Sequence, residues 1–227
     1  MSLTIAHMPR GGDGRKWAAQ NIERGHYLHK MPDPRTSFEV YSVCLHGRLI
    51  GALVVGRPEA TRCADWYGSV DDVRARRCEV TRWQVLNLAR VWISPDYQSG
   101  GAMCRPDVVP GYVDRRGMFR STLASESLRA AMRVIGFDYL MRRPPCFLEE
   151  PYQIEWMLSY CDTSKHHGTI YRASGFERYR VNERGIETWR IRLPALTARQ
   201  DAEIRAIADV HPRSVRYRLA RSQMQLV

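Results

Sequence analysis

Two apolar, strand-like runs with a short turn between them predict a β-hairpin in the first quarter of the chain. Two runs rich in Val, Leu, Ile and Tyr, at residues 38–45 and 48–55, flank the dipeptide His46-Gly47. A two-residue connection that contains glycine is typical of a tight turn between antiparallel strands. Apolar and β-branched runs predict further strands at residues 85–93, 155–161, 177–181 and 187–193.

Helical spacing is clearest at residues 120–135, where Leu123 and Leu128 fall on one side. Ser121 is a candidate N-cap for this helix, and Gly136 is a candidate C-terminal stop. Shorter helices are expected at residues 16–24, at residues 169–174 and, after the capping-box sequence Thr197-Ala-Arg-Gln200, up to Val210.

Four stretches carry no clear periodicity. Residues 1–14 contain three glycines and are expected to be loose. Residues 59–79 are polar and are expected to be irregular. Residues 94–118 form a long loop that contains Gly and Pro, and loops of that length are usually functional or disordered. Residues 137–153 are expected to be a connector.

The order of these elements predicts an α/β chain of the α+β kind, with one mixed sheet and helices on both faces. We expect a flexible N-terminus at residues 1–15, one catalytic domain at residues 16–194, and a C-terminal helix with a basic tail at residues 195–227. No run of about 18 apolar residues occurs, and the first 15 residues lack the apolar core of a secretory signal. The six cysteines show no zinc-ribbon spacing and are expected to be reduced. We therefore expect a cytoplasmic protein without a membrane span.

The formal net charge of +11 points to a polyanionic partner. Of the 35 basic residues only Lys16, Lys30 and Lys165 are lysine. The planar guanidinium of arginine suits phosphate groups and guanine edges, although a GC-rich coding sequence would also raise the arginine content. The phosphate contacts expected from the sequence are Arg105, Arg115, Arg116, Arg213, Arg216 and Arg218.

A polar cluster follows the strand predicted at residues 155–161. Asp162, His166, His167 and Tyr171 come after the strand and at the start of the next helix. Ligands of open α/β sheets bind at the carboxyl ends of strands, so this cluster is a candidate site. The alternative is a structural turn in which Asp162 caps the loop and the histidines face solvent.

The segment Tyr171-Arg-Ala-Ser-Gly-Phe176 resembles the Tyr-x-x-x-Gly-Phe motif that closes the acyl-CoA site of GNAT-type acyltransferases. A longer pattern, Ser159-Tyr160-x-Asp162 followed by Gly168-Thr169-Ile170-Tyr171-x-Ala173, resembles the phage Mom family of DNA-modification proteins. The resemblance spans residues 25–178 and implies a GNAT-type mixed central sheet flanked by helices on both faces. Its further matches are His26-Tyr27, Val54-Val55-Gly56-Arg57-Pro58, Arg90-Val91-Trp92 and the segment from Ser121 to Leu128.

The resemblance implies acetyl-CoA or a related acyl-CoA as the group donor. The amides at the start of the helix near residue 121 would hold the pyrophosphate of this donor. The glycine-rich turn that is usual in GNAT proteins is not cleanly present before this helix. The residues implied for the donor are Arg90, Val91, Trp92, Arg120, Ser121, Thr122, Gly168 and Tyr171.

The resemblance also implies a catalytic set of His26, Tyr27, Asp162 and Tyr171. Two roles are open for this set. In the first, Asp162 or His26 is the general base toward an amine, and Tyr171 protonates the departing thiolate. In the second, all four side chains hold a redox metal such as iron. A metal would suit the carbamoylmethyl group that the family adds to adenine, because that product needs a bond to a methylene carbon.

On this basis we expect a Mom-like enzyme that modifies the exocyclic amine of adenine in double-stranded DNA and protects phage DNA from host restriction. Because this amine lies inside the duplex, the base would be flipped out or presented in a single strand. Two alternatives stay open. One is a conventional GNAT N-acetyltransferase that acts on a protein or a small-molecule amine. The other is a non-catalytic nucleic-acid-binding module.

Overall fold

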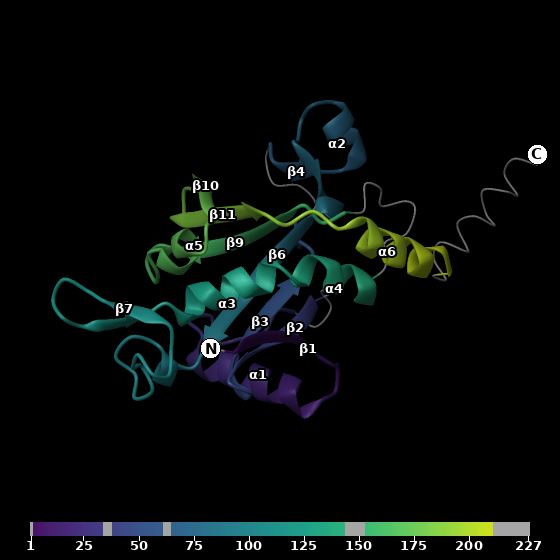
Figure 1. Ribbon diagram of the computed structural model, residues 1–227. Helices are drawn as coiled ribbons and strands as arrows, with labels where there is room; N and C mark the ends of the chain where they lie inside the picture. Colours follow the sequence, from purple (N-terminus) through teal and green to yellow (C-terminus); the bar gives the residue numbers. More distant parts are fainter. Residues whose placement is uncertain (1, 34–37, 61–64, 144–152, 211–227) are drawn as a thin grey trace, which may run out of the picture. The chain divides into compact units, whose positions relative to one another are not determined.

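The structure is a computed structural model that describes residues 2–33, 38–60, 65–143 and 153–210 (Figure 1). It divides the chain into two compact units. Segments that lie far apart in the sequence join the same unit. Unit 1 comprises Met1–Glu59, Leu86–Arg133 and Met157–Ile191, and unit 2 comprises Ala60–Val85, Val134–Trp156 and Arg192–Val227.

Seven strands form the central sheet: β1 (Leu3–Met8), β2 (Phe38–Leu45), β3 (Arg48–Gly56), β6 (Val85–Ile93), β9 (Trp156–Asp162), β10 (Glu177–Val181) and β11 (Ile186–Arg192) (Figure 1). Their order is β1-β2-β3-β6-β9-β11-β10. Strands β1, β2, β3 and β6 pair antiparallel in that order, and β10 pairs antiparallel with β11. β6 and β9 are neighbours although helices separate them in sequence, a crossover that is typical of parallel strands. The sheet is therefore mixed, as predicted.

The prediction of a loose N-terminus is wrong for residues 3–8. This segment is the edge strand β1, which pairs along β2 from Leu3 opposite Leu45 to Met8 opposite Val40. Its sequence is short and one side of it is exposed, so the three glycines that follow dominate the local pattern. Gly11, with a φ of +79°, and Gly12, the N-cap of the next helix, belong to the turn after the strand, whereas Gly14 lies in the first turn of that helix.

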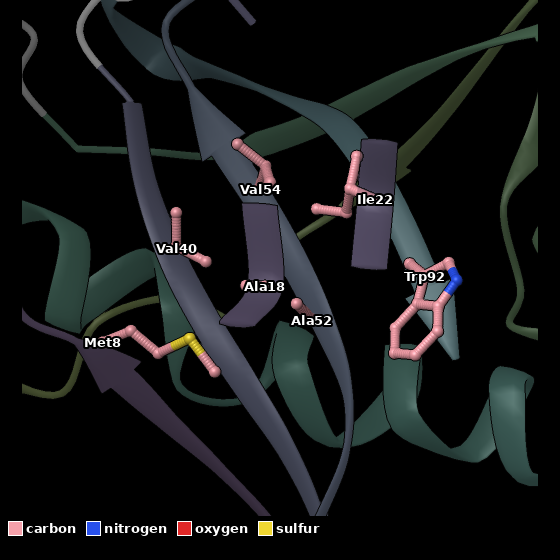
Figure 2. Packing of buried hydrophobic residues seen from close by; sticks show 7 residues of the cluster. All are labelled: Met8, Ala18, Ile22, Val40, Ala52, Val54 and Trp92. Atoms are coloured by element: carbon pink, nitrogen blue, oxygen red, sulfur yellow. The ribbon is translucent and has the colours of Figure 1, made fainter. Parts of the chain in front are cut away.

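Helix α1 (Asp13–Gly25) includes the helix predicted at residues 16–24. It buries Ala18 and Ile22 against Val40, Ala52 and Val54 of β2 and β3 (Figure 2). Strand neighbours point to opposite faces of a sheet. The next residues on these strands are equally buried, so both faces of the sheet are covered, as predicted. These residues are Tyr41, Leu53 and Val55.

The hairpin predicted at residues 38–55 is confirmed. His46 and Gly47 form its two-residue turn, with φ values of +49° and +78°. Two consecutive positive φ angles suit the right-handed twist of the flanking strands. The strand predicted at residues 85–93 is confirmed as β6, and those predicted at 155–161, 177–181 and 187–193 are confirmed as β9, β10 and β11.

The long helix predicted at residues 120–135 is wrong at both ends. Residues Phe119–Ser121 are strand β8, which pairs with β7 (Gly111–Val113) inside the segment expected to be a loop. Helix α3 (Leu123–Met132) begins after Thr122, whose amide donates to the carbonyl of Pro110. The loop segment also contains the short 3₁₀ helix η2 (Pro95–Tyr97). Pairing between β7 and β8 thus overrides the N-cap signal of Ser121.

Gly136 does not stop a helix. It lies inside α4 (Ile135–Arg142), which replaces part of the connector expected at residues 137–153. Residues 144–152 lie outside the described part of the chain. The short helix predicted at residues 169–174 is confirmed as α5 (Thr169–Ala173), and Gly175 follows it with a φ of +93°.

Unit 2 contains α4 and α6 (Ala198–Val210) together with a small two-stranded sheet of β4 (Tyr67–Gly68) and β5 (Val80–Thr81). Residues 59–79 are less irregular than expected, because Ser69 and Asp72 form a capping box on α2 (Val70–Arg74). The 3₁₀ helix η1 (Arg82–Gln84) follows β5. Thr197 and Gln200 form the capping box predicted for α6. Among the described residues no helix is long and apolar enough to cross a membrane.

Candidate functional site

A cavity of about 500 Å³ lies in unit 1 at the carboxyl ends of β6 and β9. The last three residues of β6 line it together with Tyr160 and Cys161 of β9. The other walls come from the end of α1, from Pro95 and Gln98 after β6, from residues 165–168, and from the first turns of α3 and α5. The polar stretch after β9 therefore lies at a cavity formed by two neighbouring strand ends.

His26 and Tyr27 reach the cavity from the C-terminus of α1. Their rings stack with 4.6 Å between centroids, and Tyr27 meets the ring of His166 edge-on at 4.7 Å. Nδ1 of His26 accepts a hydrogen bond from the amide of Leu28 at 3.1 Å, so the proton of the neutral ring is on Nε2. Burial lowers the pKa of His26 from 6.5 to about 4, and the charge of Arg90 adds to the effect. Near neutral pH, His26 is therefore an N–H donor in this arrangement.

Tyr171 lines the cavity from α5, and a hydrogen bond holds its hydroxyl group. Its hydroxyl lies 3.0 Å from Oγ of Ser159, and Oγ of Ser159 donates to the carbonyl of Leu88 at 2.9 Å. Because a serine hydroxyl has one proton, the Tyr171 hydroxyl is the donor to Ser159. Burial raises the pKa of Tyr171 to about 12. This phenol therefore stays protonated across the physiological range of pH.

Gly168 begins the turn into α5 with a φ of +63°. A Cβ atom at this position would overlap the ring of Trp189. The indole of Trp189 is buried and stacks on Tyr171 with 5.9 Å between centroids. Glycine is therefore required at the Gly168 position on both conformational and steric grounds.

The carboxylate of Asp162 is directed into its own loop. It accepts hydrogen bonds from the amide of Ser164 at 3.0 Å and from the hydroxyl of Ser164 at 2.7 Å. These bonds lower the pKa of Asp162, which makes its carboxylate a weaker base. Asp162 does not line the cavity, whereas His26, Tyr27 and Tyr171 do. The contacts at Asp162 match the structural alternative, in which it caps the loop.

Several cavity residues were absent from the catalytic and acyl-CoA-binding sets that the resemblance implies. They are Tyr160, Cys161, Lys165, His166, His167, Gln98 and Ala124. His166 and His167 stand in the polar cluster after β9, so the sequence carried a signal for them. Cys161 belongs to an apolar strand and carried none. Its thiol is buried, and burial raises its pKa.

The residues implied for an acyl-CoA donor divide into two groups. Val91, Trp92, Gly168 and Tyr171 line the cavity. The other four do not: Arg90, Arg120, Ser121 and Thr122.

Local contacts hold most of this second group. Nε of Arg90 donates to the carbonyl of Lys30 at 2.9 Å. Nε of Arg120 donates to Asp114 at 2.8 Å. Oγ of Ser121 accepts from the amide of Leu123 at 3.2 Å. The amino end of α3 nevertheless reaches the cavity, because Ala124 in its first turn is part of the lining.

The arginines predicted to contact phosphate lie in different surroundings. Arg105 pairs with Asp107 at 3.2 Å. Arg115 and Arg116 are exposed in the connection between β7 and β8. The remaining arginines of this prediction lie outside the described residues: Arg213, Arg216 and Arg218.

No group of three or more His, Cys, Asp and Glu side chains suited to a metal occurs within the described ranges. The four side chains considered for iron are not brought together as a ligand set, because Asp162 faces Ser164 and the Tyr171 hydroxyl bonds Ser159. The residues present therefore do not fit an iron site, the second of the two roles left open for this set.

No protein-family model matches this chain, and no curated protein matches it. Solved acetyltransferases resemble its fold. One is the aminoglycoside acetyltransferase AAC(6')-Ib with coenzyme A, with 15% identity, a TM-score of 0.46, and coverage of 90% of this chain and 99% of that one. Another is a GNAT family acetyltransferase from Elizabethkingia anophelis with acetyl-CoA bound. It has 11% identity and a TM-score of 0.40, and the match covers 84% of this chain and 98% of that one. The GNAT domain of S. lividans PAT has 9% identity and a TM-score of 0.41, and the match covers 83% of this chain and 89% of that one. Likenesses this distant do not transfer an activity.

Proposed function

We propose that this chain is a GNAT-type acyltransferase that binds an acyl-CoA in the cavity and transfers the acyl group to an amine. The observation that carries the proposal is the position of the cavity. It lies where the neighbouring strands β6 and β9 end, and the first turns of α3 and α5 border it. Ligands of α/β sheets bind at such strand ends. The tyrosine of the Tyr171-Arg-Ala-Ser-Gly-Phe176 motif lines this cavity, which adds support.

The cavity lining suits an anionic donor. The lining residues of the described chain include no Asp or Glu, whereas Lys165 contributes a positive charge. Ala124 places the amino end of α3 beside the cavity, and helix amino ends favour phosphate groups. The pyrophosphate of CoA would therefore be stabilised at this wall.

A bound acyl-CoA supplies a thioester carbonyl that an amine can attack. The C–N bond forms, the C–S bond breaks, and a proton passes overall from the amine to the sulfur. The Nε2–H group of His26 is suited to stabilise the thioester carbonyl oxygen, which gains negative charge during the attack. Tyr171 is suited to protonate the departing sulfur, because it retains its proton near neutral pH. Donation by Tyr171 requires its hydroxyl to turn away from Ser159.

Tyr171→Phe tests this role. We expect turnover with acetyl-CoA to fall by about 10²-fold, which is typical for loss of a general acid, while the Kd for acetyl-CoA changes little. Turnover is measured as CoA release with an amine panel, and the Kd by calorimetry. Tyr179→Phe is the matched control, because Tyr179 does not line the cavity. Failure of the wild-type protein to bind acetyl-CoA more tightly than about 1 mM would contradict the proposal.

A second candidate function is modification of the exocyclic amine of adenine in double-stranded DNA with an acyl-CoA-derived or carbamoylmethyl group. The β7–β8 hairpin favours it (Figure 1). Asp114 pairs with Arg120 in this hairpin, and Arg115 and Arg116 are exposed in its turn. Together with a net charge of +11, these arginines suit a phosphate backbone.

Mass spectrometry of nucleosides from cells that express the protein separates the candidates. Modified adenine would support the DNA reaction. Unmodified adenine together with soluble, acyl-CoA-binding protein would favour a conventional N-acetyltransferase. Salt-sensitive DNA binding without any acyl-CoA binding would indicate a non-catalytic nucleic-acid-binding module.

A further inference from the structure

A buried carboxylate lies behind the wall of the cavity. Glu187 on β11 is 7% exposed, although ionised carboxylates are costly to bury without partners. Its Oε2 accepts a hydrogen bond from Nε1 of Trp189 at 2.8 Å, and its Oε1 accepts one from Arg178 at 3.0 Å. Each carboxylate oxygen therefore has a donor, and one of these donors is an indole.

Strand geometry explains why these three residues meet. Glu187 and Trp189 are two residues apart on β11, so their side chains emerge on the same face of the sheet. Arg178 on β10 stands opposite Trp189 in the antiparallel register. The ladder thus places the charge that compensates Glu187 next to the indole that Glu187 holds.

Trp189 transmits this arrangement to the cavity wall. Its ring stacks on Tyr171 at an interplanar angle of 28°. It also fills the space where a side chain at Gly168 would lie. Tyr171 and Gly168 both line the cavity, whereas Glu187 and Trp189 do not. The indole is therefore a spacer between a fixed carboxylate and two parts of the wall.

We propose that Glu187 and Trp189 are positioning residues that hold Tyr171, beside the Gly168 turn, in the geometry the transfer requires. This inference rests on the proposed acyl transfer at the same cavity. A hydrogen-bonded indole has one orientation, and that orientation sets the plane of the Tyr171 ring. A freely packed apolar residue in place of Glu187 would fill the same space without fixing that plane.

Glu187→Ala and Glu187→Gln test the proposal together. The amide oxygen that E187Q introduces can still accept from Nε1 of Trp189, so we expect this variant to keep most of the turnover. We expect E187A to lose at least about tenfold in kcat per folded molecule, since small misplacements of a reacting group cost that much or more. Its Kd for acetyl-CoA should change by less than about threefold. Glu177→Ala is the matched control, because Glu177 pairs with Arg190 on the same two strands without bonding Trp189.

A double-mutant cycle with Tyr171→Phe separates positioning from simple destabilisation. If Glu187 acts through Tyr171, E187A has little further effect on kcat in the Y171F background. An undiminished effect in that background, or equal losses in E187A and E187Q, would overturn the proposal.

A spectroscopic arm does not depend on the proposed activity. In protein labelled with 5-fluorotryptophan, Trp189→Phe assigns the Trp189 resonance in the ¹⁹F spectrum. We expect E187A and Y171F each to shift this resonance, and E177A to leave it in place. If the wild-type protein shows no turnover, the proposed function is contradicted. Shifts of the Trp189 resonance in E187A and Y171F would still support the contacts from Glu187 through Trp189 to Tyr171. An unshifted resonance in both E187A and Y171F would refute the positioning role even in an active enzyme.

Discussion

Gly25 at the end of α1 lies directly against the indole of Trp92, so that a Cβ at Gly25 would stand 2.5 Å from Nε1. Trp92 is in turn fixed by edge-on contact with Trp17, at 5.5 Å between ring centroids. The end of α1 can therefore pack this closely against Trp92 of β6 only if residue 25 has no side chain. The next two residues, His26 and Tyr27, enter the cavity from this contact.

Gly25→Ala should destabilise the fold by about 1–3 kcal/mol, the usual range for overpacking, because Trp92 is buried and cannot move freely. It should also weaken acetyl-CoA binding by displacing His26 and Tyr27. Chemical denaturation and calorimetry measure the two effects. Gly136→Ala is the control: a Cβ there meets only Leu193, at 3.6 Å, so this change should be neutral or should stabilise by about 0.5–1 kcal/mol. Equal stabilities for the two variants would contradict the close contact.

The strands that the sequence predicts best are those whose pattern and pairing agree. β2, β3 and β6 have apolar runs, and the turn at His46-Gly47 fixes the register of β2 against β3. β1 escaped prediction because an edge strand needs little apolar sequence and gains its order from pairing with β2. The helix start predicted at Ser121 was wrong because serine is a favourable N-cap residue by type, whereas the backbone of Ser121 pairs with β7. Non-local pairing decided both cases, and local propensity does not contain it.

The sequence predicts the part of the candidate site that lies at the end of a strand. The stretch after β9 identified the right edge of the sheet, and Tyr171 and Gly168 line the cavity there. His26 and Tyr27 came from resemblance alone, because nothing in their local pattern places the end of α1 beside β9. The orientation of the Asp162 carboxylate depends on Ser164, two residues away, and sequence pattern does not choose between loop and cavity.

Ser159→Ala should cost about 1–3 kcal/mol of stability, since it leaves the Tyr171 hydroxyl and the Leu88 carbonyl without their shared partner in a buried place. Tyr171→Phe should cost less, because Ser159 keeps its bond to Leu88. Denaturant unfolding of both variants measures the difference. A larger loss of stability in Y171F than in S159A would show that Ser159 does not link the Tyr171 hydroxyl to the Leu88 carbonyl.

The low pKa of His26 makes stability depend on pH. The folded value of about 4 lies below the ordinary value of 6.5, so between these values the unfolded chain binds more protons at this residue. Stability contributed by His26 is therefore complete above pH 6.5 and is lost as the pH falls toward 4. We expect His26→Gln to flatten the stability profile in this window.

His46→Asn is the matched control for that profile. It also removes an imidazole, but from the exposed β2–β3 turn, and asparagine tolerates the positive φ of this position. Denaturation midpoints at about pH 4.5, 5.5 and 6.5 would be compared for the three proteins. An unchanged slope in H26Q would contradict burial of the His26 ring.

Asp114 organises the β7–β8 hairpin, and its removal tests how far that hairpin is a fixed element. Oδ1 of Asp114 accepts from the amides of Arg116 and Met118, at 2.9 and 3.0 Å, while Oδ2 accepts from Arg120 at 2.8 Å. Asp114→Ala removes all three bonds. We expect hydrogen exchange across residues 111–121 to quicken by about tenfold or more, with no change in the central sheet.

Asp107→Ala is the control for this exchange experiment, because it breaks a single exposed pair with Arg105 and no backbone bond of the hairpin. If the hairpin contacts DNA through Arg115 and Arg116, D114A should also reduce DNA affinity although it makes the net charge more positive. That opposition separates an effect of shape from an effect of charge. Tighter DNA binding by D114A, equal to that of D107A, would mean that only total charge matters and that the ordered turn does not.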